Sequence, residues 1–211
     1  MKIVVVGATD LTASLIREIV ERGHQVAVFD DVKEGVEKLK AELDVTGAAV
    51  DLLNFDELEE YGFSRADVVV LAHRNDTVNA VLSIYARIVN IPRVLVVSRS
   101  KKVAEAVRKL GLASTVLAIE SLVEKAMASA FAGVETIELP GGYVVAALDS
   151  KTMNRLVGMS IADFRDRWRF TVLKVVDREG AVREPTDEYV IKEGDIVLVL
   201  AEKSGIRELL L

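Results

Sequence analysis

The chain has 211 residues, of which 51% are apolar, enough to fill a substantial core. Its 33 acidic and 27 basic residues give a net charge of −6, and the basic ones are scattered, so nucleic acid is not an expected partner. The sequence has no Cys, which excludes disulfides and thiolate zinc sites. It has only two His, which are few for a histidine-based catalytic metal site. No apolar stretch approaches the roughly 18 residues of a membrane span, so we expect a soluble chain whose membrane role would depend on a partner.

The first part of the chain alternates between predicted strands and helices. The β-branched run at residues 2–6 ends at Gly7 and predicts a parallel strand buried on both faces. Apolar residues then recur at helical spacing up to Gly23, a helix stop. The pattern continues with strands at residues 25–29, 47–50, 67–72, 93–98 and 114–117, and helices at residues 33–43, 56–61, 77–90, 102–110 and 121–132. This order predicts an α/β fold, a Rossmann-like doubly wound parallel sheet with helices on both faces.

The pattern changes after residue 132, where Gly133, Pro140, Gly141 and Gly142 gather and short strands replace the alternation. We therefore expect two domains, residues 1–132 and 133–211. The second is predicted as strands at 143–148, 171–176, 190–191 and 196–200, a helix at 161–168 and a hairpin turn at 177–180. This order fits a small α+β domain, with Trp168 and Phe170 in its core or in a dimer interface.

The turn after the first strand departs from a dinucleotide-binding turn. Such a turn carries three glycines, whereas this chain has Gly7, Thr9 and Thr12 at those positions. A side chain at Thr9 takes space that a pyrophosphate would use, and Asp10 adds negative charge beside a helix N-terminus that should attract phosphate. We predict Asp10 as the helix N-cap, with a ligand role as the alternative. A conventional dinucleotide pose is therefore disfavoured.

Further polar residues follow the later strands. Asp30 either accepts hydrogen bonds from an adenosine ribose or is a strand-end turn residue. Asp51 is either an adenine-side contact or a turn cap. His73 lies at the edge of the sheet where ligands collect, but with no acid-base partner in the sequence it is predicted to be a loop residue. Glu120 either ligates a metal cation at a subunit interface or complements the dipole of the helix that it begins.

Several stretches together carry a family resemblance. They are KIVVVGATD at residues 2–10, HQVAVFD at 24–30, ADVVVLAHRNDTVN at 66–79, PRVLVVSRS at 92–100, STVLAIESLVEK at 114–125, and the tail segments at 154–180 and 188–209. Over essentially its full length the chain resembles the RCK family, also called the TrkA and KtrA regulators of potassium uptake. In that family a Rossmann-like TrkA-N domain precedes a crossover helix and a TrkA-C domain. The tail is the more specific part, because many enzymes share a Rossmann turn.

The resemblance implies a cytoplasmic, non-enzymatic subunit, assembled as homodimers or a larger ring, that gates a membrane potassium channel or transporter on binding a nucleotide such as ATP, ADP, AMP or NAD(H). Gly7 matches the family's first glycine and Asp30 its ribose carboxylate. The family also commonly has the same residues at the positions of Asp51, Asn79, Arg99 and Glu120. The chain departs from the family pattern at Thr9, Asp10, Thr12 and Leu52–Leu53, the last of which replaces a Gly-Thr pair near the adenine.

Several functions remain open at this point. The first domain binds a nucleotide, binds an unusual ligand, or is a ligand-free scaffold. The resemblance also implies that the tail domain can take a small ligand, including a cyclic dinucleotide, between two copies. The alternatives are an NAD(P)-dependent Rossmann oxidoreductase, which would need a proton donor that the sequence does not show, and a regulator of another cation transporter.

Overall fold

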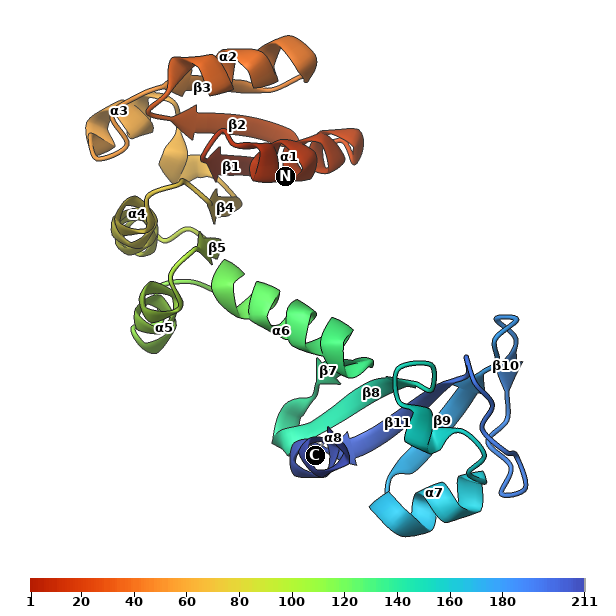
Figure 1. Ribbon diagram of the computed structural model, residues 1–211. Coiled ribbons are helices and arrows are strands. Elements are labelled where there is room, and N and C mark those ends of the chain that lie inside the picture. The colour runs from red at the N-terminus through yellow and green to blue at the C-terminus, as the bar shows by residue number, and fades with distance from the viewer. Residues whose placement is uncertain (211) are drawn as a thin grey trace. The chain divides into compact units, whose positions relative to one another are not determined.

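The computed structural model describes residues 1–210 and forms two compact units, one from Met1 to Leu122 and one that begins at Val123 (Figure 1). The predicted boundary after residue 132 keeps the helix at 119–132 whole, whereas the compact units divide inside it; as a domain boundary it stays a prediction. None of the helices within residues 1–210 combines the length and the apolar character that a bilayer span requires.

The first unit contains a six-stranded parallel sheet in the order β3-β2-β1-β4-β5-β6, which confirms the Rossmann-like prediction. Its strands are β1 (Lys2–Val6), β2 (Gln25–Asp30), β3 (Thr46–Ala49), β4 (Val68–Leu71), β5 (Arg93–Ser98) and β6 (Thr115–Ala118). The continuous apolar run of β1 places it between β2 and β4, with Val4 beside Ala27 on one side and Val69 on the other. The sheet order therefore reverses beside β1, where ligands of such folds bind.

Helices cover both faces of this sheet (Figure 1). They are α1 (Asp10–Glu21), α2 (Lys33–Glu42), α3 (Phe55–Glu60), α4 (Asp76–Ile88) and α5 (Lys101–Lys109), with a 3-10 turn η1 (Phe63–Arg65) and the helix α6 (Ile119–Ala132) after β6. One core joins Val5 and Val28 of the sheet to Ile16 of α1. The other joins Val6 and Phe29 to buried residues of α3, α4 and α5. Alternate residues of one strand thus enter different cores.

The second unit contains an antiparallel sheet in the order β10-β9-β11-β8-β7. Its strands are β7 (Val134–Glu138), β8 (Tyr143–Asp149), β9 (Thr171–Val176), β10 (Val182–Arg183) and β11 (Ile196–Glu202); its helices are α7 (Ile161–Trp168) and α8 (Lys203–Leu210), with 3-10 turns η2 (Pro140–Gly142) and η3 (Asn154–Leu156). The predicted hairpin turn at 177–180 joins β9 to β10. Phe170 is buried, and Trp168 packs against the same core, so their core role is confirmed.

Two strands and one α-helix of this unit were not predicted, and one predicted strand was wrong. The segment 190–191 forms an isolated bridge from Ser160 to Val190 rather than a strand. Helix α8 was missed because Gly205 interrupts its helical pattern. A Cβ at Gly205 would lie 2.8 Å from the Phe170 ring, so the glycine lets this helix approach the core closely. Strand β7 has mostly exposed side chains, and β10 has two residues, so neither gives a clear apolar pattern.

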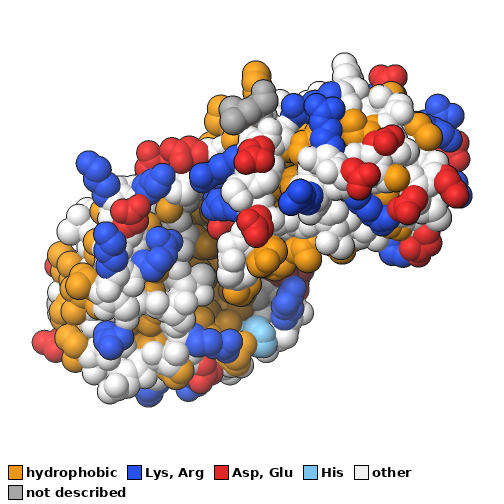
Figure 2. All heavy atoms as spheres, turned by 90° about the horizontal axis from the view of Figure 1, so that it is seen from below, with side chains coloured by type: hydrophobic (Ala, Val, Ile, Leu, Met, Phe, Trp, Pro, Cys, Tyr) orange, Lys and Arg blue, Asp and Glu red, His pale blue; other side chains and the backbone are white. Residues whose placement is uncertain are grey.

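The surface mixes charged and apolar side chains. On the face that Figure 2 shows, Lys and Arg side chains alternate with Asp and Glu, and apolar side chains reach the surface between them. Among residues 1–210, the most exposed large apolar side chain belongs to Phe131 of α6, at 92% exposure. No residue of α6 is buried.

Candidate ligand site at the carboxyl edge of the parallel sheet

The turn from β1 to α1 requires a glycine at position 7. Gly7 has a φ of 111°, and a Cβ there would lie 2.7 Å from the carbonyl oxygen of Ala72. Its N–H donates to the Phe29 carbonyl oxygen at 2.8 Å. The turn thus touches the ends of both β2 and β4, which brings three strand ends to one place.

Thr9 and Thr12 hydrogen-bond to each other across this turn. Thr9, not Asp10, is the N-cap of α1: its hydroxyl accepts the Thr12 N–H at 3.4 Å, while Thr12 Oγ1 accepts the Thr9 N–H at 2.9 Å. Thr12 Oγ1 also donates to the Gly7 carbonyl oxygen at 2.6 Å, and its side chain is buried. The prediction that Asp10 caps the helix is therefore wrong. The threonine pair forms a capping box, and Asp10 is the exposed first residue of the helix.

Asp30 is held from inside the protein. It is buried, with one carboxylate oxygen accepting the Ala8 N–H at 2.7 Å and the other accepting the Val32 N–H at 2.9 Å. The Arg74 guanidinium lies 3.9 Å from the second oxygen. The carboxylate therefore fastens the β1–α1 turn to the end of β2, which is a structural role whether or not a ligand also contacts it.

His73 has a partner that sequence reasoning did not find. Its Nδ1 accepts the Asn75 N–H at 3.3 Å, and its Nε2 lies 3.2 Å from Asp31 Oδ1, to which it donates. Arg74 also forms a salt bridge with Asp31. Burial raises the pKa of Asp31, but hydrogen bonds with Asp30, His73 and Arg74 outweigh it and hold that pKa below its ordinary value. His73 is the loop residue that was predicted, joined to the end of β2.

Ligand atoms of Asp30, Asp31 and His73 lie within 4.8 Å of one another, a spacing that could suit a metal ion. The surrounding chemistry does not fit one. His73 Nε2 is already engaged with Asp31 in a hydrogen bond, and Arg74 already supplies positive charge to the same carboxylate. Glu120, the predicted metal ligand, is not in this group. It accepts the Lys101 N–H at 3.1 Å from the first turn of α6, which favours its helix-dipole alternative.

Two hollows flank the Thr9–Asp10 turn. One, of about 330 Å³, also contains Asp30, Lys38 and Arg74; the other, of about 240 Å³, contains His73 and Arg99. The structure therefore gathers most of the predicted site residues at one edge of the sheet. Asp51 does not line either hollow. Its carboxylate accepts the Leu53 N–H at 3.0 Å, as expected of the turn-cap alternative.

Two polar side chains of α4, the buried Asn79 and the half-buried Asp76, hold the loops of this edge in place. Asn79 is fully buried; its amide donates to the carbonyl oxygens of His73 and Val97, and its Oδ1 accepts the His73 N–H. Asp76 accepts hydrogen bonds from the backbone N–H groups of Arg99 and Ser100. The sequence signal for Asn79 is its position on the face of α4 that also carries the buried Leu82, where a polar residue needs a partner.

Comparisons with known proteins identify both parts of the chain. Family models for the TrkA-N domain and the TrkA-C domain match residues 3–119 and 145–210. A Trk system potassium uptake protein TrkA homolog from Methanothermobacter thermautotrophicus is 22% identical, with 99% of this chain and 97% of that protein covered.

Solved structures show the same fold. The GsuK RCK domain matches with a TM-score of 0.70 and 20% identity, and the GsuK channel bound to NAD with a TM-score of 0.68 and 19% identity. These alignments cover 99% and 97% of this chain but 46% and 38% of those chains, so the chain spans less than half of each. With a TrkA-N match over more than half of its length and a TrkA-C match behind it, the chain belongs to the TrkA-N domain family and also carries a TrkA-C domain.

Proposed function

We propose that this chain is a cytoplasmic, ligand-responsive regulatory subunit of a potassium uptake system and acts through a membrane channel or transporter subunit. The observation that carries the proposal is the order of the two domains, a TrkA-N domain and then a TrkA-C domain, in a chain that aligns with nearly the whole of a TrkA homolog. Regulation needs no covalent chemistry. Ligand binding shifts the populations of two conformations, and the membrane partner responds to the change.

The carboxyl edge of the parallel sheet is the proposed sensing site. One solved relative in fold is a channel bound to NAD. In this chain, however, the Thr9 and Thr12 side chains fill the turn where a pyrophosphate would approach, and Asp10 stands at the helix N-terminus. Negative charge at the positive end of the helix dipole repels phosphate. We therefore expect the site to bind pyrophosphate-bearing nucleotides weakly and to favour a ligand that does not carry that group.

Restoring the turn should restore nucleotide binding. We expect the variant Thr9→Gly, Asp10→Arg, Thr12→Gly to bind ATP or NADH at least about tenfold more tightly than the natural sequence, because it opens space for the phosphates and reverses the local charge. Calorimetric titration with ATP, ADP, AMP and NADH measures the difference.

The Thr12 substitution removes half of the capping box, so the single variant Asp10→Arg serves as a second measurement. It leaves both threonines in place and should improve ATP binding by a smaller factor. A natural chain that binds ATP as tightly as both variants would contradict this explanation of the turn, while leaving the regulatory role untouched.

We further propose that two copies of the chain associate through α6. Val123, Met127 and Phe131 recur every four residues and form one row along this helix, with exposed fractions of 49%, 68% and 92%. Large apolar side chains in a row on a water-exposed helix face mark an interaction surface. A second copy can cover this row with its own, as in isologous dimers.

The variant Phe131→Asp should therefore dissociate the oligomer. A carboxylate within the apolar row loses its hydration in the interface without gaining a partner, and we expect the dissociation constant of the complex to rise at least a hundredfold. Light scattering coupled to size-exclusion chromatography measures the mass in solution. The control is Val182→Asp, at a side chain of β10 that is 66% exposed. Equal masses for all three proteins would exclude α6 as the interface.

A further inference from the structure

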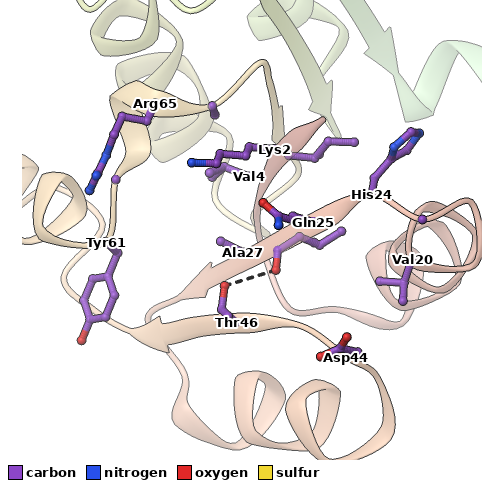
Figure 3. Close-up of a pocket in the computed structure, with 15 residues that line it drawn as sticks. Lys2, Val4, Val20, His24, Gln25, Ala27, Asp44, Thr46, Tyr61 and Arg65 are labelled. Atoms are coloured by element: carbon purple, nitrogen blue, oxygen red, sulfur yellow. Dashed lines mark hydrogen bonds between the residues drawn. The ribbon is translucent and has the colours of Figure 1, made fainter.

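A cavity of about 660 Å³ lies at the other edge of the parallel sheet, where β1, β2 and β3 begin. Figure 3 shows the strand starts with Lys2, Gln25 and Thr46 around it. Its volume is within the range of about 300 to 1,000 Å³ typical of small-molecule sites. It is separate from the proposed sensing site, which lies at the carboxyl ends of the same strands.

Small residues create this hollow. Val4 and Ala27 are neighbours in register and lie on the same face of β1 and β2. Ala27 presents only a methyl group, whereas Val26 and Val28 beside it in the strand carry larger side chains into the opposite core. On the wall, α3 ends at Glu60 and is followed by Gly62, which has no side chain. Ala27 is therefore only half-buried at this end of the sheet, whereas Val4 beside it is buried.

The charges around the cavity are divided between its ends. Figure 3 shows Lys2 and Arg65 at the end that also holds Tyr61, and Asp44 at the far end beside Val20. Within the described residues, the side chains of Lys2 and Arg65 form no hydrogen bond or ion pair. The nearby Asp67 carboxylate accepts the backbone N–H of Lys2 at 2.7 Å. In a chain with a net charge of −6, two unpaired cations in one hollow favour an anionic ligand.

Tyr61 supplies a flat wall next to these cations. Its ring centroid lies 5.8 Å from that of the buried Phe29, which supports the ring from within the protein, while 51% of Tyr61 remains exposed. Aromatic rings in such positions bind the faces or edges of other flat groups. An apolar floor, an aromatic wall and two cations at one end together resemble the mixture of groups found in ligand pockets.

We propose that this cavity binds a small organic anion with a flat apolar body. Its carboxylate or phosphate group lies between Lys2 and Arg65, where both cations can donate to its oxygens. Its apolar body lies over the half-buried Ala27, beside Tyr61. This site goes beyond the proposed regulatory function and provides a second place where a metabolite could act on the first unit.

The test compares benzoate with benzamide, which has nearly the same shape but no charge. Both are titrated into the ¹⁵N-labelled full-length chain, and amide resonances are followed by NMR. We expect benzoate to shift the resonances of Ala27, Thr46 and Gly62 in a saturable way and to bind at least about tenfold more tightly than benzamide. Phenyl phosphate identifies the preferred head group: tighter binding than benzoate assigns a phosphate ligand, and weaker binding a carboxylate.

The double variant Lys2→Gln, Arg65→Gln should abolish the preference for benzoate over benzamide. Both side chains are exposed, so the fold should tolerate the change. The matched control is Lys102→Gln, an exposed cation outside the cavity, which should bind like the natural chain. Ala27→Leu fills the floor and should weaken both probes. Equal affinities for benzoate and benzamide, an unchanged preference in the double variant, or shifts confined to the carboxyl edge near Thr9 would each overturn the proposal.

Discussion

The variant Asp30→Ala is expected to lower the free energy of unfolding of the first unit by about 3 kcal/mol, because two backbone donors lose a charged acceptor. In the folded protein the Asp30 carboxylate accepts from Ala8 and Val32, at 2.7 and 2.9 Å, in a buried position. Alanine replaces neither bond. Urea unfolding followed by circular dichroism measures the change, and Asp30→Asn should lose less, because its amide oxygen can still accept one of the two N–H groups.

The neighbouring Asp31 provides the control. Its partners are side chains, and its own side chain is 47% exposed, so Asp31→Ala should cost well below the loss at Asp30. The pKa of Asp31 is held below its ordinary value of 3.8, so the carboxylate stabilises the fold above about pH 4 and loses this effect as the pH falls through the lower folded-state pKa. Equal losses for Asp30→Ala and Asp31→Ala would show that Asp30 does not fasten the turn.

Local patterns predicted most of the first unit. The run at 2–6 and the glycine at position 7 predicted a buried strand and a tight turn, and the structure has both. The predicted bounds of the strands and helices are close to the observed ones. They differ at the ends, where neighbouring residues decide the conformation. Asp10 was predicted as the cap because Asp is a good capping residue, but the Thr9–Thr12 pair satisfies two backbone donors at once and takes that place.

The pairing of His73 with Asp31 could not be read from the sequence. The two residues are 42 positions apart, and they meet because β1 lies between β2 and β4, so that the ends of β2 and β4 approach each other over the β1–α1 turn. Strand order is a property of the whole sheet. The same holds for the cavity at the opposite edge, which depends on where three strands begin and on the small side chain at Ala27.

In the second unit the sequence predicted the strands with regular apolar alternation and missed elements that lack it. The buried Asp195 is a further feature that no periodic pattern shows. One of its carboxylate oxygens accepts the Lys192 N–H at 2.9 Å and the Tyr189 hydroxyl at 2.8 Å. Its other oxygen has no protein partner among the described residues. Burial, together with the hydrogen bond to Asp195, raises the pKa of Tyr189 to about 12.

The variant Asp195→Ala should lower the free energy of unfolding of the second unit by about 3 kcal/mol. It removes the shared acceptor of two donors, and each hydrogen bond to a charged group contributes about 1.5 to 3 kcal/mol. Part of this loss is offset, because the variant no longer buries a charge. Asp195→Asn keeps the accepting oxygen in place and should cost less. Thermal and urea unfolding of the full chain, followed by the fluorescence of Trp168, report on this unit because Trp168 packs against its core.

Tyr189→Phe separates the two donors, since it removes the hydroxyl and leaves the Lys192 N–H bonded to Asp195. The raised pKa means that Tyr189 stabilises the fold fully below pH 10, the ordinary value, and that this effect is lost as the pH rises through about 12. The phenylalanine variant should therefore lose stability at neutral pH and show a flatter decline between pH 10 and 12 than the natural chain. If Asp195→Asn costs as much as Asp195→Ala, the charge itself, rather than the shared acceptor, holds the turn before β11 in place.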